Sequence, residues 1–177
     1  MAQKGINNGP EIVEKNSQSC DYKIRKATER DIPQLSIHHS EMFKEIWKNK
    51  GKSQGDSESF ELGNAYSQKL NRELGNLCRC WVIETGRELV ASGALTIVSF
   101  VPIPDDSSSR VGYLHSMYTD KRYRGRGFAN LIVKAALQYC RENGIKRVVL
   151  NASEAGRPIY EKIGFISSPE TMKIFLE

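Results

Sequence analysis

The stretch RYRGRGFA, residues 122–129, lies between a predicted strand and the most regular helical pattern in the chain. Gly125 and Gly127 permit a tight turn that directs several backbone N–H groups at one point. The helix that follows adds the positive end of its dipole, and the arginines add full charge. We expect this turn to bind a pyrophosphate; the alternative is a tight strand-to-helix turn that binds nothing.

Two common nucleotide-binding motifs do not fit this turn. The sequence contains no Gly-x-x-x-x-Gly-Lys-Ser/Thr string, which a mononucleotide P-loop requires. A dinucleotide-binding turn needs a third Gly or Ala, where Asn130 stands, and an acidic residue after the next strand, where Asn151 stands. Both readings are therefore weakened.

The segments around the turn predict a strand-helix-strand unit. A strand is expected over residues 110–119, and apolar residues then follow helical spacing from Phe128 to Cys140. Asn143-Gly144 ends the helix, and residues 147–151 form a short buried strand. Such a unit makes a right-handed crossover between parallel strands.

Further elements are expected on both sides of this unit. Thr28 caps the first helix, with Asp31 at its third position and Pro33 early in it, and Gly86-Arg87 marks a hairpin. In chain order, we expect a strand at 22–26, this helix, a mobile loop at 48–59, a helix at 60–76, strands at 79–85 and 88–100, a helix from Pro158 to Gly164, and a closing strand at 172–176.

The composition fits one globular domain. The chain has 177 residues and 39% hydrophobic residues; we expect a flexible tail at 1–19 and a single domain at 20–177. Four cysteines without a Cys-x-x-Cys pair and three histidines predict no metal site. No stretch is long and apolar enough for a membrane span or a signal core, so we expect a cytoplasmic protein that does not bind membranes.

The net charge of +5 is concentrated in the last third of the chain. Residues 1–120 carry 15 basic and 16 acidic side chains, whereas residues 121–177 carry 11 and 5. Four of the basic residues fall within 121–126, which favours one compact anionic ligand over a long polyanion. The alternative is a solvated run of charge.

These motifs together resemble the GNAT superfamily of acetyl-CoA-dependent N-acetyltransferases. Arg122-x-x-Gly125-x-Gly127 is similar to the Gln/Arg-x-x-Gly-x-Gly/Ala loop of that family. The resemblance extends to YKIRKATERD at 22–31, MYT at 117–119 and NASEAGRPIYEKIGF at 151–165. It implies an α/β (α+β) fold with a mixed, mostly antiparallel sheet of six to seven strands, a splayed central parallel pair and about four helices.

The resemblance also implies a set of site residues. The pantetheine arm would lie between the splayed strands, against the backbones of Met117 and Thr119, with Asn151 bonded to it and the Tyr160 hydroxyl near the sulfur. The predicted catalytic residue is Tyr160, and the predicted acetyl-CoA-binding residues are Met117, Tyr118, Thr119, Arg122, Arg124, Gly125, Arg126, Gly127, Phe128, Ala129, Asn151 and Ser153.

Acetyl transfer needs two proton movements. An amine with a pKa of about 10 must lose a proton before it attacks the thioester, and the departing thiolate must gain one or be stabilised. Tyr160 is suited to the second step. For the first step, the sequence leaves His115, Glu41, Glu84 and water open as the general base; the cysteines are expected to have no catalytic role.

Three functions are consistent with the sequence to different degrees. The leading hypothesis is transfer of acetyl from acetyl-CoA to a small-molecule amine or a peptide amino group. The second is a non-catalytic CoA-binding sensor, and the third, far behind, is a nucleic-acid-binding module. We expect no nucleic-acid partner, because no basic surface interleaved with aromatic residues accompanies the cluster, and a homodimer is possible.

Overall fold

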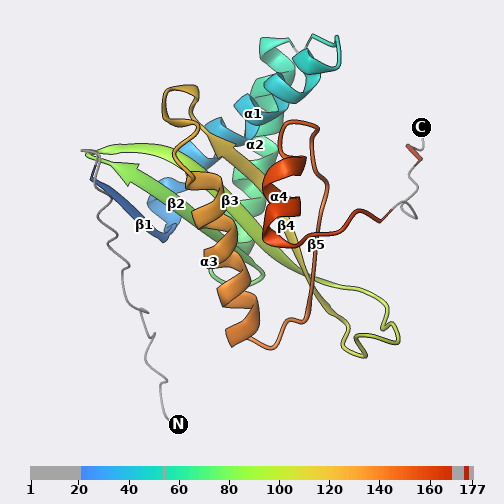
Figure 1. Ribbon diagram of the computed structural model, residues 1–177. Coiled ribbons are helices and arrows are strands. Elements are labelled where there is room, and N and C mark those ends of the chain that lie inside the picture. The colour runs from blue at the N-terminus through green and yellow to red at the C-terminus, as the bar shows by residue number, and fades with distance from the viewer. Residues whose placement is uncertain (1–20, 54, 169–173, 176–177) are drawn as a thin grey trace.

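The computed structural model describes residues 21–53, 55–168 and 174–175 (Figure 1). The predicted tail at 1–19 lies outside this part of the chain. The elements are β1 (Tyr22–Lys26), η1 (Glu29–Asp31), α1 (Ile32–Asn49), α2 (Asp56–Glu73), β2 (Cys78–Thr85), β3 (Glu88–Ser99), β4 (Arg110–Thr119), η2 (Lys121–Tyr123), α3 (Phe128–Glu142), β5 (Arg147–Leu150) and α4 (Arg157–Ile163).

One mixed sheet runs through the described residues in the order β1-β2-β3-β4-β5. Its first three strand pairs are antiparallel and β4 pairs with β5 in parallel, which confirms the α/β class, the four helices and the parallel unit. The prediction of six to seven strands is wrong, because the described chain forms five. The expected closing strand at 172–176 falls mainly outside the described residues, and Ile174 and Phe175 are not in a strand.

Helices cover both faces of the sheet. Figure 1 shows α3 and α4 on the near face and α1 and α2 on the far face. Side chains of β2 alternate between the two: Trp81 and Ile83 belong to the core beneath α3, whereas Cys80 and Val82 pack with α1 and α2. Two apolar cores therefore fix the helices relative to one sheet.

The second helix begins earlier than predicted. The apolar pattern predicted a loop over 48–59 and a helix from Phe60, but α2 starts at Asp56. The backbone N–H of Gly55 donates a hydrogen bond to Glu58 Oε2 at 3.0 Å, which stabilises a first turn without apolar side chains. The periodicity of apolar residues could not detect this polar turn.

The two halves of β4 differ. Residues 111–114 pair with β5, but the parallel ladder stops at Leu114. On the other edge, His115 pairs with Ala94 and Tyr118 with Ser92, so that two residues of β4 face Gly93 alone. Ser116 in this bulge has a φ of 52°.

The bulge requires a glycine on the neighbouring strand. A Cβ atom at Gly93 would lie 2.3 Å from Met117 Sδ and 2.7 Å from Ile132 Cγ2. The missing side chain lets Met117 fold back against β3. The second half of β4 lies beyond its last pair with β5, Leu114 with Leu150. The splay of the parallel pair stays a prediction.

Candidate active site

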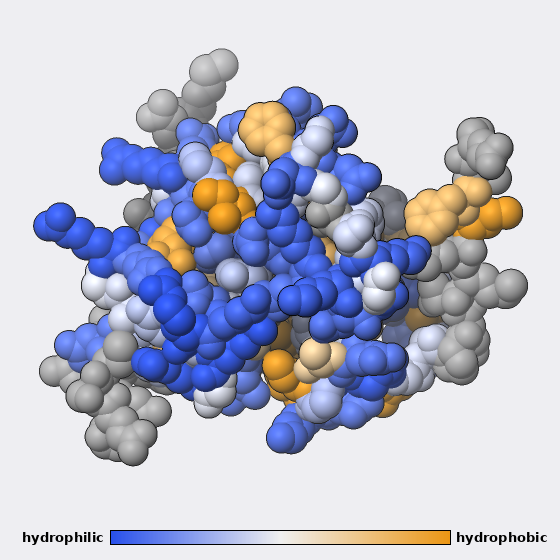
Figure 2. Space-filling view, turned by 90° about the horizontal axis from the view of Figure 1, so that it is seen from above, coloured by the Kyte–Doolittle hydropathy of each residue, from blue (hydrophilic) through white to orange (hydrophobic). Residues whose placement is uncertain are grey.

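A cleft of about 1950 Å³ lies beyond the last paired residues of β4 and β5. Its walls come from α1, α2, the bulged half of β4, the turn before α3 and the segment between β5 and α4. The surface seen in Figure 2 is mainly hydrophilic, with hydrophobic groups in separate small patches. Helices from both faces of the sheet, α1 and α2 on one and α4 on the other, thus border the cleft.

Most of the predicted site residues meet in this cleft. Arg122 and Arg126 do not line it. Those that do are Met117, Tyr118, Thr119, Arg124, Gly125, Gly127, Phe128, Ala129, Asn151, Ser153 and Tyr160.

The glycine turn has the expected backbone conformation. Gly125 and Gly127 adopt φ values of 78° and 80°, and a Cβ atom at either would meet nothing within 4 Å. Glycine is needed here for the left-handed backbone rather than for space. Asp120 steadies the start of the turn, since its carboxylate accepts the Arg122 backbone N–H at 2.9 Å.

Carboxylates already pair with two arginines of the basic cluster. The Arg124 guanidinium bonds Glu45 Oε2 at 2.7 Å and the Thr119 carbonyl oxygen at 2.9 Å, so it links the turn to α1. Arg122 pairs with Asp120 at 3.0 Å and with Glu88, and it holds the pKa of Asp120 below its usual range.

Two further cations complete this cluster. Lys121 Nζ lies 3.6 Å from Glu45, and the Arg126 guanidinium lies 5.0 Å from the centre of the Tyr123 ring. Within the described residues, Arg126 makes no ion pair. Much of the positive charge of residues 121–126 is thus balanced by carboxylates of the protein itself.

Residues from the other wall are held by local contacts. Asn151 Nδ2 donates to the Tyr113 hydroxyl at 2.9 Å, and the Gly156 N–H donates to Ser153 Oγ at 3.2 Å. The Tyr160 ring packs against Phe165 with 5.8 Å between centroids. Burial raises the pKa of Tyr160 to about 12, so its hydroxyl keeps its proton at neutral pH.

A hydrogen-bonded cluster occupies the wall at the bulge. His39 Nδ1 lies 2.8 Å from Ser116 Oγ, and His115 Nδ1 lies 2.9 Å from the same oxygen. His115 Nε2 lies 2.8 Å from Thr96 Oγ1. We call these four residues the histidine cluster.

The surroundings keep His39 uncharged. Burial, with a smaller contribution from His115, lowers the pKa of His39 to about 4. Its ring stacks on Tyr66 with centroids 3.9 Å apart and meets Phe43 edge to face. His39 is therefore a neutral imidazole at pH 7, held between aromatic rings.

The structure separates the candidate general bases. Glu84 lies outside the cleft and is paired with Arg25. Glu41 pairs with Lys44 at 3.4 Å and lines a separate groove of about 920 Å³. His115 lines the cleft.

His39 is a cleft residue that the sequence reasoning did not select. The helical spacing places it on the buried stripe of α1, which by itself indicates packing. Its partner Ser116 is 77 residues away in the chain. Only the fold brings these two residues together.

Neither a metal centre nor a membrane-spanning helix is found in the described residues. Over 21–53, 55–168 and 174–175, no three His, Cys, Asp or Glu side chains are grouped to hold a metal ion. In the same ranges, no helix has the length and apolar character needed to cross a bilayer.

The bulged strand, the parallel ladder that ends at Leu114 and the glycine turn before α3 agree with an acetyltransferase fold. A model of the "Acetyltransferase (GNAT) family" matches residues 39–165, and the chain belongs to this family. It is an acyltransferase of the N-acetyltransferase type.

Individual relatives agree with this assignment. The chain is 32% identical over 107 residues to glucosamine 6-phosphate N-acetyltransferase of Trypanosoma brucei brucei, covering 60% of this chain and 71% of that protein. It is 26% identical over 147 residues to the uncharacterized N-acetyltransferase YjgM of Escherichia coli (strain K12), covering 80% of each. A crystal structure of a predicted acetyltransferase with acetyl-CoA from Clostridium acetobutylicum matches with a TM-score of 0.73 and 27% identity, over 87% of this chain and 96% of that one.

Proposed function

We propose that this protein transfers the acetyl group of acetyl-CoA directly to a primary amine. The observation that carries the proposal is the opening between β4 and β5, which meets the glycine turn in one cleft. Beyond Leu114, no strand of the described chain pairs with the β5-side edge of β4. Backbone N–H and C=O groups on that edge can therefore pair with an extended, amide-containing ligand.

The glycine turn is suited to the phosphates of the same ligand. The amides of 124–129 precede α3, so backbone donors and the positive end of the helix dipole act at one place. Met117, Tyr118 and Thr119 would contact the pantetheine arm, and Asn151 and Ser153 would contact it from the opposite wall. Arg122 and Arg126 would act on the phosphates from outside the cleft.

Tyr160 is the proposed general acid. The direct reaction forms the amide C–N bond and breaks the thioester C–S bond, and the leaving thiolate takes up a proton. A tyrosine whose pKa is raised to about 12 by burial remains protonated until such an anion forms beside it. The N–H groups at the bulge can stabilise the negative charge on the carbonyl oxygen.

The acceptor class is a primary amine on a small molecule or a peptide. Glucosamine 6-phosphate is the first amine to test, because a relative 32% identical to this chain is named for that acceptor. The cytoplasmic location, the absence of a resident metal ion and a homodimeric state stay predictions.

A two-part experiment tests the proposal. Acetyl-CoA at about 100 times its dissociation constant should stabilise the protein by about 2.7 kcal/mol in thermal unfolding. Thiol release should then depend on an added amine, screened over glucosamine 6-phosphate, spermidine, tyramine and a lysine peptide. Binding without turnover would favour the CoA sensor, whereas salt-dependent binding to DNA or RNA without any effect of CoA would favour the nucleic-acid module.

A further inference from the structure

We propose that His39 is the general base of this reaction and that His115 is a positioning residue, which receives the proton from His39 through the Ser116 hydroxyl. The inference rests on the proposed amine acetylation. It follows from the hydrogen-bond partners of the two imidazole rings. Both rings contact the same Ser116 oxygen atom, but only one of them has a ring nitrogen without a partner.

His115 has no nitrogen left for an amine. Its Nδ1 contacts Ser116 Oγ at 2.9 Å and its Nε2 contacts Thr96 Oγ1 at 2.8 Å. His39 uses only Nδ1, and its Nε2 makes no hydrogen bond within the part of the chain that the structure describes. Because His39 also lines the cleft, its Nε2 is the nitrogen that an incoming amine can reach.

The shared hydroxyl sets the protonation of both rings. Ser116 has one proton, so it can donate to only one of the two Nδ1 atoms, and the other Nδ1 must donate to it. In one direction, His39 Nδ1–H donates to Ser116, Ser116 donates to His115 Nδ1, and His115 Nε2–H donates to Thr96. This direction leaves the lone pair of His39 Nε2 available; the reverse direction places a proton there.

The proton then moves without leaving an isolated charge on His39. An alkylammonium gives a proton to His39 Nε2, the Nδ1 proton passes to Ser116, and the proton of Ser116 passes to His115 Nδ1. The amine nitrogen attacks the acetyl carbon and the C–S bond breaks. Tyr160 gives its proton to the thiolate and takes up the second proton that the amine nitrogen loses. One proton is left on His115 and returns to solvent, which balances the reaction.

Groups around His39 keep its ring neutral before the amine arrives. Tyr66 stacks on it from α2, His115 faces it from β4, and Cys80 of β2 lies in the same core as Tyr66. Only burial and His115 lower its pKa, to about 4, so the base is unprotonated at neutral pH. Ser116 keeps a φ of 52° in the bulge, a conformation that is unfavourable for serine and that places its hydroxyl between the two rings.

Asparagine substitutions test the two roles separately. The side-chain amide of asparagine can take the place of Nδ1, so His39→Asn keeps a bond to Ser116 but has no basic nitrogen. We expect kcat with the best amine of the panel to fall about 100-fold or more, with unchanged acetyl-CoA affinity. His115→Asn should lower kcat about 10-fold and straighten the curved dependence of rate on the D2O fraction that a two-proton transfer produces.

His38→Asn is the matched control. His38 is the neighbouring residue on α1, bonds Ser92 through its own Nδ1 at 2.9 Å, and does not line the cleft. Its kcat should stay within about threefold of the unsubstituted enzyme. Ser116→Gly relieves the positive φ and should lower kcat about 10-fold without loss of stability.

Failure of this inference can be distinguished from failure of the proposed function. If the unsubstituted protein turns over but His39→Asn keeps more than a third of its kcat with the same pH profile, His39 is not the base. If no amine is acetylated, ¹⁵N NMR of the imidazoles still decides: a proton on His39 Nδ1 supports the relay, and a proton on Nε2 overturns it.

Discussion

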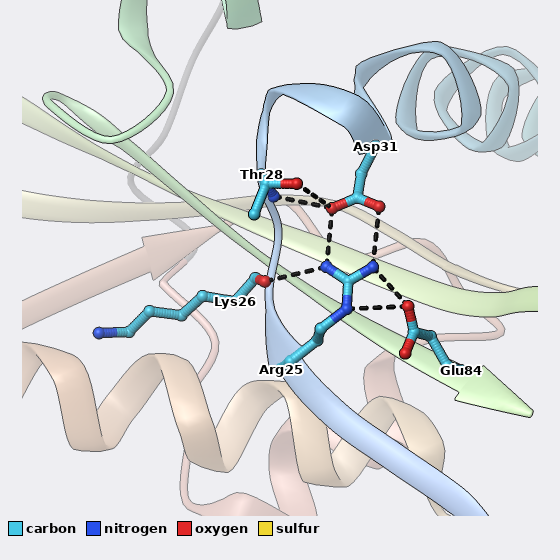
Figure 3. A network of polar contacts seen from close by, with 5 residues as sticks. All are labelled: Arg25, Lys26, Thr28, Asp31 and Glu84. Carbon is cyan, nitrogen blue, oxygen red and sulfur yellow. Dashed lines mark hydrogen bonds and ion pairs between the residues drawn. The ribbon is translucent and has the colours of Figure 1, made fainter. Parts of the chain in front are cut away.

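Two polar clusters, one at the start of α1 and one near its middle, satisfy their hydrogen bonds in different ways. The arginine cluster, formed by Arg25, Thr28, Asp31 and Glu84, joins β1 and β2 to the start of α1 (Figure 3). Arg25 donates five hydrogen bonds, two to Asp31, two to Glu84 and one to the Lys26 carbonyl oxygen. A guanidinium has five N–H donors, so none remains for a ligand.

The histidine cluster is uncharged at His39 and incompletely paired. His39 and His115 share the Ser116 hydroxyl, and one imidazole nitrogen is left over at the wall of the cleft. The comparison shows that full pairing of charge fixes the backbone, whereas an unpaired group at a cavity is available for chemistry. The two clusters should therefore respond to substitution in opposite ways.

The largest effect on stability is expected from Arg25→Met. The substitution leaves the nearly buried Asp31 carboxylate without its bidentate partner, and the 22% exposure of Arg25 reduces the loss. We expect the free energy of unfolding in urea to fall by about 2–3 kcal/mol. Amine-dependent thiol release should not change at temperatures where the variant is folded.

Arg72→Met is the control for that loss. Arg72 is exposed on α2, and its replacement should change stability by less than about 0.5 kcal/mol. If Arg25→Met were as stable as this control, the arginine cluster would not fix the junction of β1 and α1.

Tyr160→Phe should have the opposite profile. Removing the hydroxyl should lower kcat about 100-fold, equivalent to about 2.7 kcal/mol, because the thiolate loses its proton donor. The hydroxyl makes no hydrogen bond within the described residues, so the free energy of unfolding should change little. Tyr139→Phe, on α3 outside the cleft, is the control; an equal loss of kcat in both variants would contradict the assignment.

His38, the neighbour of His39 on α1, and the arginine cluster should lose their contributions to stability at different pH values. Burial lowers the pKa of His38 to about 4, so below pH 6.5 the unfolded chain binds a proton that the folded chain does not. The contribution of neutral His38 to the free energy of unfolding is fully present above pH 6.5 and is lost as the pH drops toward 4. Between pH 6.5 and 5 the loss should be about 2 kcal/mol from this residue.

His38→Asn should remove that loss and keep the hydrogen bond to Ser92. Urea unfolding at pH 7 and pH 5 measures the difference. Asp31 behaves differently: Arg25 holds its pKa low, so its contribution is present above the ordinary carboxyl pKa and is lost only at more acidic pH. An unchanged pH dependence in His38→Asn would mean that His38 titrates normally.

The sequence predicted those parts of the fold and cleft that depend on local patterns. Gly125 and Gly127 are recognisable because their backbone conformation requires glycine, and the unit from β4 to β5 follows from apolar periodicity and one helix end. The start of α2 was missed because its first turn is polar. The strand count came from the resemblance alone and proved too high.

Long-range pairing could not be predicted. His39 and Ser116 are 77 residues apart, and a histidine on an apolar helical stripe gives no sign of its partner. Likewise, four basic residues within 121–126 indicated an unbalanced charge, but Glu45 on α1 and Glu88 on β3 neutralise much of it. Local charge in a sequence is therefore an uncertain measure of the charge that a ligand meets.

The smallest effect is expected from substitution of Arg124 and Arg126 at the glycine turn. One of these arginines is paired with a carboxylate and the other is not, so the two variants test how pairing affects ligand binding. Arg124→Gln removes a charge that Glu45 already balances. Any fall in acetyl-CoA affinity should therefore come from the Glu45 carboxylate, which is left unpaired and repels the phosphates. Arg126 has no carboxylate partner in the described ranges, and Arg126→Gln should weaken binding about threefold, or about 0.6 kcal/mol, at low salt. Both are measured by calorimetry at low and high salt. Restored affinity in the Arg124→Gln, Glu45→Gln double variant would show that the unpaired Glu45 carboxylate caused the loss. A loss of affinity that persists in the double variant would show instead that Arg124 breaks its pair with Glu45 and binds the phosphates itself.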